Sequence, residues 1–219
     1  MCPFCYIGKR HLENALKALP FQQEVDIEWK SYQLNPEYQN TSGETTYDYL
    51  ARAKGMTPAQ AKQLTGNVVE MAEQAGLHFD FDRSIPANSF DAHRLIHLAK
   101  ANGKQDEAEE ALFRAHFMDG KDIADKATLS AIGQELGLTA ESIERLFSSN
   151  DYAEAVQYDL YESRQIGIRG VPYFVFDRKY ALSGAQPVET FTAALSQSYN
   201  EWKVGQDNNA VCDDDGCAI

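Results

Sequence analysis

The sequence of 219 residues has few cysteines and few positive charges. Its 20 Lys and Arg residues are outnumbered by 33 Asp and Glu residues, which gives a net charge of −13. Nucleic acid and anionic membrane surfaces are bound through clustered positive charge, so we expect neither as a partner. Long apolar runs are also missing, and none approaches the roughly 18 residues of a membrane-spanning helix. No secretory signal is visible either, which favours a cytoplasmic location.

The four cysteines lie at the two ends of the chain, with Cys2 and Cys5 at one end and Cys212 and Cys217 at the other. Four cysteines in a chain of this length exclude a small secreted disulfide scaffold. The first pair forms a Cys-x-x-Cys motif, and apolar residues at helical spacing follow it up to Leu19. This pattern predicts a helix that begins at the motif.

A cysteine at the start of a helix has an unusual electrostatic environment. Unpaired backbone N–H groups and the helix dipole stabilise a thiolate there, and the thiolate is the form that attacks disulfides. We therefore interpret Cys2 as the reactive thiol and Cys5, one turn further on, as the resolving thiol. The alternative is a structural zinc site, which Cys212 and Cys217 would have to complete.

The rest of the chain divides into strand and helix patterns. Val25–Leu34 alternates apolar and polar residues and predicts a strand. Helical periodicity then dominates as far as Asn150, and another helix follows Asp151. Two short strands are predicted between Tyr173 and Leu182, before a last helix from Pro187 to about Trp202. The sequence thus predicts an α/β unit that is split by an all-helical insertion.

A second candidate feature is Val171-Pro172, which stands directly before the predicted strand that starts at Tyr173. A proline at this place can adopt the cis form and leave neighbouring backbone groups free to pair with a peptide. The alternative is an ordinary trans proline at the start of an edge strand.

Together these features resemble the thioredoxin-fold disulfide oxidoreductases of the DsbA superfamily, and most closely their FrnE-like branch. The segments that carry the resemblance are CPFCYIGKRHLE (2–13), WKSYQLNP (29–36), NSFDAHRL (88–95), LFRAHF (112–117) and GIRGVPYFVF (167–176).

The resemblance implies an α/β thioredoxin fold with an inserted helical domain. The expected thioredoxin domain comprises residues 1–40 and 151–203, the helical insertion comprises 41–150, and 204–219 is an acidic tail. The family places a strand before its Cys-x-x-Cys motif, whereas only Met1 precedes it here, so we expect the working protein to carry residues upstream.

The resemblance also implies roles for single residues. Cys2 is the expected nucleophile, Cys5 the resolving thiol, and Pro172 the cis-proline that faces them, with the backbone of Val171 offered to the substrate. DsbA has histidine where Phe4 stands, and phenylalanine lacks a charge that could hold the thiolate. We therefore expect a potential between the roughly −270 mV of thioredoxin and the roughly −120 mV of DsbA.

Other residues are weaker candidates. Phe4 and Tyr6 flank the reactive sulfur and are candidates for an apolar rim that binds unfolded or peptide substrates. His93 and Asn88 lie in a segment that matches the family and are candidate cleft residues. His93 and His97 have the spacing of metal ligands, but no third ligand stands nearby, so no metal is expected.

The second cysteine pair, Cys212 and Cys217, encloses three aspartates in an acidic tail. One reading is a shuttle, in which the tail dithiol exchanges with Cys2 and Cys5 as an accessory redox pair. The other readings are a local disulfide, capture of a metal by the thiols and aspartates, and no role.

The predicted function is that of a thiol–disulfide oxidoreductase or isomerase acting on protein or peptide thiols and disulfides. No bound cofactor is expected, whereas glutathione is a candidate co-substrate, and glutathione or a thioredoxin-like protein is the candidate reductant. Two alternatives remain. Kappa-type glutathione transferases and 2-hydroxychromene-2-carboxylate isomerases share the split fold but usually carry serine as the nucleophile. A thiol metal-binding protein would need all four cysteines as ligands.

Overall fold

The computed structural model describes residues 1–40 and 43–210 of the chain, without the side chains of 207–210. Most of the described chain is helical. The elements in order are α1 (Pro3–Lys17), the 3-10 helix η1 (Gln22–Glu24), α2 (Thr46–Lys54), α3 (Pro58–Gln74), α4 (Phe90–Ala101), α5 (Gln105–Phe117), α6 (Lys126–Glu135), α7 (Ala140–Ser148), α8 (Ala153–Gln165), β1 (Tyr173–Phe176), β2 (Tyr180–Ser183) and α9 (Val188–Ala210). None of these described helices is both long and apolar enough to cross a bilayer.

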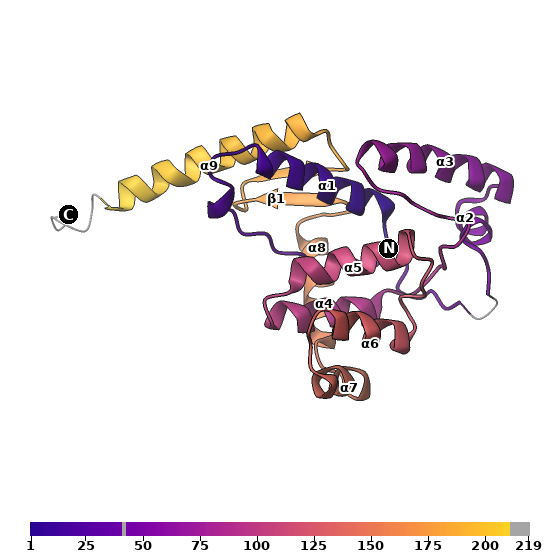
Figure 1. The fold of residues 1–219 in the computed structure, drawn as a ribbon. Helices are drawn as coiled ribbons and strands as arrows, with labels where there is room; N and C mark the ends of the chain where they lie inside the picture. Colours follow the sequence, from indigo (N-terminus) through magenta and orange to yellow (C-terminus); the bar gives the residue numbers. More distant parts are fainter. Residues whose placement is uncertain (41–42, 211–219) are drawn as a thin grey trace.

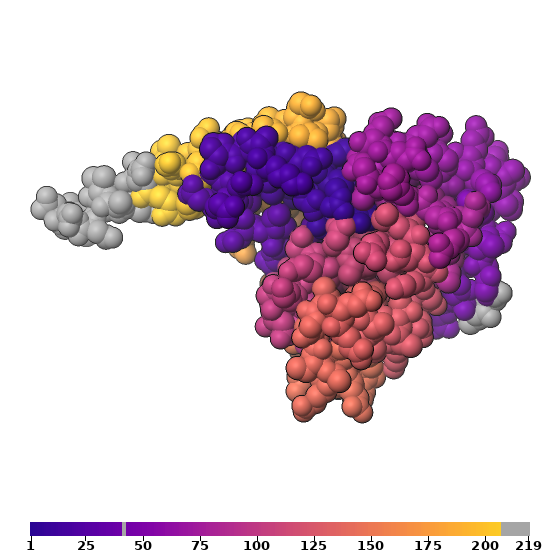
Figure 2. All heavy atoms as spheres, viewed as in Figure 1, coloured from indigo at the N-terminus to yellow at the C-terminus, as the bar shows by residue number. Residues whose placement is uncertain are grey.

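The two ends of the chain come together in one layer of the molecule. Helices α1 and α9 pack on each other, and α9 also packs on the antiparallel pair of β1 and β2, in which Phe174 lies opposite Leu182. Helices α4 to α7 form a separate mass below this layer, and α2 and α3 lie to one side of it (Figure 1). The space-filling view shows these masses clearly, with the far end of α9 projecting beyond the others (Figure 2).

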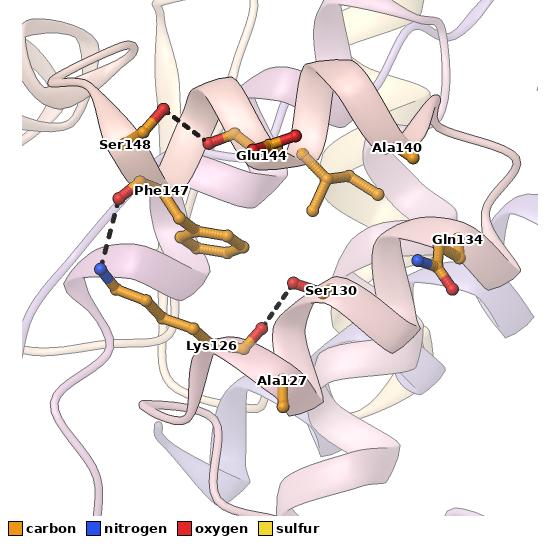
Figure 3. A pocket seen from close by; sticks show the side chains of 9 residues that line it. Lys126, Ala127, Ser130, Gln134, Ala140, Glu144, Phe147 and Ser148 are labelled. Atoms are coloured by element: carbon orange, nitrogen blue, oxygen red, sulfur yellow. Dashed lines mark hydrogen bonds between the residues drawn. The ribbon is translucent and has the colours of Figure 1, made fainter.

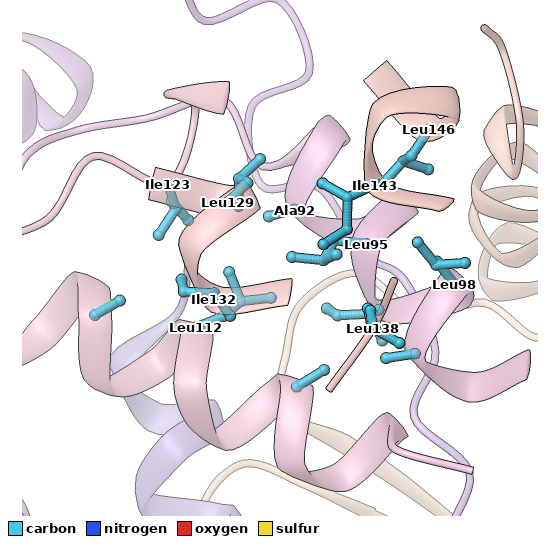
Figure 4. Packing of buried hydrophobic residues seen from close by; sticks show 14 residues of the cluster. Ala92, Leu95, Leu98, Leu112, Ile123, Leu129, Ile132, Leu138, Ile143 and Leu146 are labelled. Atoms are coloured by element: carbon cyan, nitrogen blue, oxygen red, sulfur yellow. The ribbon is translucent and has the colours of Figure 1, made fainter. Parts of the chain in front are cut away.

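Three clusters of buried apolar residues hold these layers together. The helical block is built around Leu95, Leu112 and Leu129, which are completely buried where α4, α5 and α6 meet (Figure 4). A second cluster includes Tyr6 of α1 together with aromatic residues of the helical region, and a third joins α1 to the sheet and α9 through Phe191. Because α1 contributes to the second and third clusters, it connects the β layer with the helices.

The predicted strand at Val25–Leu34 does not form. The segment has no ladder partner among the described residues, and a strand exists only when a neighbour completes its hydrogen bonds. Side chains from the helices bind its backbone instead. The amide of Trp29 donates to Gln105 Oε1 at 3.2 Å, and the amide of Ser31 donates to Asp159 Oδ2 at 2.8 Å.

Two helices also differ from the sequence-based expectation. The short helix α2 was not predicted, although Thr45 and Asp48 form a capping box at its start. The last helix begins as predicted but continues past Trp202 to Ala210, so part of the expected tail is helical. The other predicted helices and the two short strands are present within a few residues of their expected limits.

Candidate active site

Cys2 lies where the sequence places it, at the start of α1. Cys2 is the N-cap residue in an extended conformation, and Pro3 occupies the first turn. The side chain of Cys2 is 9% exposed, and Cys2 and Cys5 are both free thiols. Proline has no N–H group and is favourable in the first turn, where that group has no partner inside the helix.

The local hydrogen bonds favour the thiolate of Cys2. A hydrogen bond with the Cys5 thiol, helped by the backbone N–H groups of Cys5 and Phe4, lowers the pKa of Cys2 from 9.0 to about 7, although burial opposes this change. Cys5 moves in the opposite direction, since its hydrogen bond to Cys2 and its burial raise its pKa well above 9.0. Near pH 7 the Cys2 thiol is thus about half ionised, whereas Cys5 keeps its proton.

The loop before β1 faces this sulfur from the opposite end of the chain. The Val171-Pro172 peptide bond is cis, as the resemblance implies, and the Cys2 thiol donates a hydrogen bond to the Val171 carbonyl at 3.4 Å. A thiolate cannot donate, so ionisation of Cys2 releases this carbonyl. The Val171 carbonyl then lacks the hydrogen bond that the Cys2 thiol donates.

Gly8 allows α1 to approach this loop closely. A Cβ at this position would lie 3.0 Å from the ring of Phe174 and 3.5 Å from Cγ of Pro172. Real Cβ contacts are seldom this short, so a larger residue would push the helix away from the loop or displace the ring. Gly8 thereby helps to set the distance between Cys2 and Val171.

On its other face α1 is fixed to α5 by stacking and by charge. The Tyr6 ring stacks on Phe113 with centroids 5.0 Å apart, and the Tyr6 hydroxyl donates to Glu110 at 2.5 Å. Lys9 is only 2% exposed, and its ammonium group contacts Asp106 at 3.1 Å and Glu110 at 3.3 Å. This paired, nearly buried cation orients α1 against the helical block, because an unpaired charge would be costly there.

The two residues expected at an apolar rim differ in their exposure to solvent. Phe4 is partly exposed beside the cysteines, so its expected contact with substrates remains a prediction. Tyr6 is 1% exposed and stacks between Phe79 and Phe113, so the expectation that it forms part of the rim is wrong. Its helical position turns the ring away from solvent and into the aromatic cluster.

Asn88 and His93 support the end of the expected strand segment and the residues just after it. Asn88 accepts a hydrogen bond from Gln33 at 2.9 Å and donates to the Pro36 carbonyl at 2.8 Å. His93 is buried and lies 3.2 Å from the Tyr32 carbonyl, and burial lowers its pKa to about 4. These contacts give both residues a structural role, and their expected contact with substrate remains a prediction.

His97 and His93 contact different groups and do not form a metal site. His97 Nε2 lies 3.1 Å from Asp159 and 3.1 Å from the Ser31 hydroxyl. Burial alone would raise the pKa of Asp159, but hydrogen bonds from His97 and Ser31 lower it to about 2. Within residues 1–40 and 43–210, no three His, Cys, Asp or Glu side chains gather as metal ligands. Cys212 and Cys217 lie outside the described residues.

Two surface hollows lie apart from the cysteine pair. One, of about 470 Å³, opens between α6 and α7 and includes Phe147, whose carbonyl accepts a hydrogen bond from Lys126 at 3.3 Å (Figure 3). The other, of about 370 Å³, has a more polar lining that includes Asn88. Neither hollow is lined by Cys2 or Cys5, so the candidate site is the surface formed by Cys2 and Val171.

One residue beside the site was not found from the sequence. Glu109 of α5 is 5% exposed, and its charge raises the pKa of Cys5. A sequence signal did exist, because Glu109 shares an apolar helical stripe with Phe113, four residues later. A carboxylate on such a stripe is rarely buried without a reason.

Comparisons with known proteins identify the family of the chain. Residues 1–196 match the model of the DsbA-like thioredoxin domain family. The chain belongs to this family. The thioredoxin fold with an inserted helical block, which the sequence predicts, is thereby confirmed.

Two relatives show how far the similarity extends. A probable DsbA oxidoreductase from Streptomyces coelicolor, known from its crystal structure, is 35% identical in sequence to this chain. The two structures superimpose with a TM-score of 0.86, and the match covers 91% of this chain and 86% of that one. The uncharacterized protein YwbO of Bacillus subtilis (strain 168) is 26% identical over 198 residues, which are 90% of this chain and 92% of YwbO.

Proposed function

We propose that this protein is a thiol–disulfide oxidoreductase or isomerase of the FrnE-like branch, with Cys2 as its nucleophile. The observation that carries the proposal is the asymmetry of the pair, since Cys2 has a pKa of about 7 whereas the pKa of Cys5 is raised well above 9.0. A nucleophile and a resolving thiol need this difference in pKa, because the first must be ionised at neutral pH while the second stays protonated until the mixed disulfide has formed.

In the proposed reaction the two sulfurs act in turn. The Cys2 thiolate attacks one sulfur of a substrate disulfide, and the other substrate sulfur leaves as a thiolate. The mixed disulfide is then broken by Cys5, which loses its proton, bonds to Cys2 and releases the second substrate thiolate. Run in reverse, the same steps oxidise a substrate dithiol, and a mixed disulfide that is attacked by another substrate cysteine gives isomerisation.

Protein or peptide disulfides fit this site as substrates. The Val171 carbonyl is released when Cys2 ionises, and a carbonyl in an extended loop can accept a hydrogen bond from a substrate backbone. The partly exposed ring of Phe4 provides apolar contact beside the sulfur. The proposal further includes a cytoplasmic location, glutathione or a thioredoxin-like reductant, and a shuttle role for Cys212 and Cys217.

A turnover assay tests the proposal. The wild-type protein should catalyse the reduction of insulin disulfides and the refolding of scrambled ribonuclease, and Cys2→Ser should abolish both activities. A Cys212→Ser/Cys217→Ser variant keeps Cys2 and Cys5, so the activity that it retains comes from this pair alone, and the activity that it loses measures the proposed shuttle. Full activity in Cys2→Ser would overturn the proposal, and glutathione-dependent turnover that survives in this variant would favour the kappa-type transferase alternative.

A further inference from the structure

The starting observation is a hydrogen bond between α1 and the turn 183–186, which connects the end of β2 to α9. Nδ1 of His11 lies 2.8 Å from the backbone carbonyl of Gln186. A carbonyl oxygen can only accept a hydrogen bond, so Nδ1 carries a proton and donates this bond. His11 is partly exposed, and it has no part in the reaction steps proposed above.

The turn 183–186 is held together by its own hydrogen bonds. The backbone amide of Gln186 donates to the Gly184 carbonyl at 2.9 Å, and the side-chain amide of Gln186 donates to the Ser183 carbonyl at 2.7 Å. Gly184 has a φ of 84°, in the left-handed region that glycine adopts without strain. Because these bonds connect Gln186 with Gly184, a contact that fixes one of these residues also fixes the other.

The same turn holds the loop that faces the reactive sulfur. The amide of Gly184 donates to the Pro172 carbonyl at 2.8 Å. Proline has no N–H group and its carbonyl already accepts this bond, so the carbonyl of Val171 is the group that the loop can offer to a peptide beside the sulfur. The Val171 carbonyl is also the acceptor of the Cys2 thiol at 3.4 Å. The position of a bound peptide relative to Cys2 therefore depends on the bond between Gly184 and Pro172.

Two residues of α1 face the loop and the turn from the same side of the helix. Gly8 and His11 are three positions apart, which places them on neighbouring turns of one helix face. A Cβ on Gly8 would lie 3.5 Å from Cγ of Pro172, so the helix passes close to the loop at this point. Such a contact limits how near the loop can come, but it does not stop the loop from moving away. The hydrogen bond of His11 provides the attraction that keeps the turn, and with it the loop, against α1.

We propose that His11 is a positioning residue for peptide substrates. Through the turn 183–186 it holds the Val171 carbonyl in register with the reactive sulfur. The inference rests on the proposed function, since it concerns how a peptide binds beside the nucleophile. A peptide needs this carbonyl in place in order to bind, whereas a small disulfide that makes no backbone contact does not. Loss of the His11 bond should therefore weaken the binding of peptides and leave the reactivity of Cys2 unchanged.

The test compares two disulfides that release the same coloured aromatic thiolate. One is a short peptide whose single cysteine is joined to the aromatic thiol, and the other is the symmetrical aromatic disulfide. Reduced protein that carries Cys212→Ser and Cys217→Ser is mixed with an excess of either reagent, so the fast release of colour reports attack by Cys2. The dependence of this rate on the concentration of the peptide gives a half-saturating concentration and a maximum rate.

In His11→Leu the half-saturating concentration of the peptide should rise about tenfold, the effect expected when one hydrogen bond no longer fixes a binding group. At low peptide concentration the same change appears as a fall of about tenfold in the rate. The maximum rate, its pH profile and the rate with the symmetrical disulfide should keep their wild-type values, because the hydrogen bonds that lower the pKa of Cys2 are unchanged.

Three further variants separate the hydrogen bond from the shape of the side chain. His11→Ala also removes the donor and should behave like His11→Leu. His11→Asn should restore most of the binding, because the amide nitrogen of asparagine can donate from nearly the position of Nδ1. His78→Leu is the matched control, since it makes the same substitution at an exposed histidine between α3 and α4 and should leave both reactions unchanged.

Four results would contradict these expectations. Wild-type saturation by the peptide in His11→Leu and His11→Ala would overturn the inference. Peptide binding in His11→Asn as weak as in His11→Leu would also overturn it, since the side chain would then act through packing alone. Equal slowing with both reagents would do the same, because that pattern indicates a distorted site. A fast release that persists in Cys2→Ser would refute the proposed function itself, and the inference with it.

Discussion

The hydrogen bond between the two thiols is the largest cause of the acidity of Cys2, and it can be removed without touching the nucleophile. Cys5→Ala deletes the donor, whereas Cys5→Ser keeps a hydroxyl group that can donate a similar bond. We expect the pKa of Cys2 to rise from about 7 toward 9.0 in Cys5→Ala, and to rise less in Cys5→Ser. The remaining backbone N–H groups at the start of α1 limit the change.

The size of the effect on reactivity comes from two opposing factors. A thiol with a pKa of about 7 is half ionised at pH 7, whereas one with a pKa of 9.0 is ~1% ionised, a ratio of about 50. The more basic thiolate is the better nucleophile, by about tenfold over this interval for a Brønsted coefficient near 0.5. A complete return to 9.0 would therefore slow the attack of Cys2 on a disulfide about fivefold at pH 7, and raise the rate at high pH about tenfold.

The assay measures the rate of reaction of Cys2 with a small aromatic disulfide across pH, in the background that lacks Cys212 and Cys217. The rate curves of Cys5→Ala and Cys5→Ser should cross, with the alanine variant slower at neutral pH and faster at high pH. Identical curves for both variants, each with a midpoint near pH 7, would refute the reasoning. That outcome would assign the acidity of Cys2 to the helix N-terminus alone.

Further predictions concern stability, measured by denaturant unfolding. Because burial raises the pKa of Glu109 to about 8, its contribution to the free energy of unfolding is fully present below pH 4.5 and is lost as pH rises toward 8. The free energy of unfolding of Glu109→Gln should therefore rise by up to about 4 kcal/mol relative to that of the wild type across this interval. Equal slopes of unfolding free energy against pH in the two proteins would contradict this. Gly66→Ala should stabilise the protein by about 0.5–1 kcal/mol, because the site is open and helical. Gly133→Ala should lower the free energy of unfolding by about 1–2 kcal/mol, because its Cβ would lie 2.8 Å from the buried Ile143. A higher free energy of unfolding would show that the side chain of Ile143 moves aside without cost. Asp159→Asn should cost about 1–3 kcal/mol at pH 7, since it weakens the bonds to His97 and Lys30, and this cost should shrink as the pH of the assay falls toward 2.

The helix start at the cysteine pair was predictable because its signal is local, since a Cys-x-x-Cys motif followed by an apolar stripe stands in consecutive residues. The strand after Val171-Pro172 was predictable for the same reason, but the cis form of the proline was expected only from the family resemblance, because the residues alone also allow a trans proline. Most helices were predictable for a similar reason, because an apolar stripe is visible within one short stretch of sequence. N-cap residues such as Thr57 and Thr139 mark the start of a helix in the same local way.

Features that depend on distant partners were not predictable in the same way. The alternation in Val25–Leu34 is typical of a strand, but a strand needs a neighbour, and in the described residues the neighbours of this segment are the side chains of Gln105 and Asp159. Tyr6 was expected at an apolar rim because it flanks the reactive sulfur, yet the stack with Phe113 buries it. Glu109 lies 104 positions after Cys5, so its charge raises the pKa of Cys5 only because α5 packs on α1.

The contacts of α1 have a consequence for protein engineering. The helix that carries both cysteines packs with one face on the sheet and α9. Its other face contacts Phe79, Phe113 and the carboxylates of α5. A minimised version in which the helical insertion is replaced by a short linker would leave Tyr6 and the Lys9 ammonium without their partners. The insertion thus supplies one of the two surfaces on which α1, with its two cysteines, is packed. Efforts to shorten or transplant this scaffold should keep α5 with α1 as one unit.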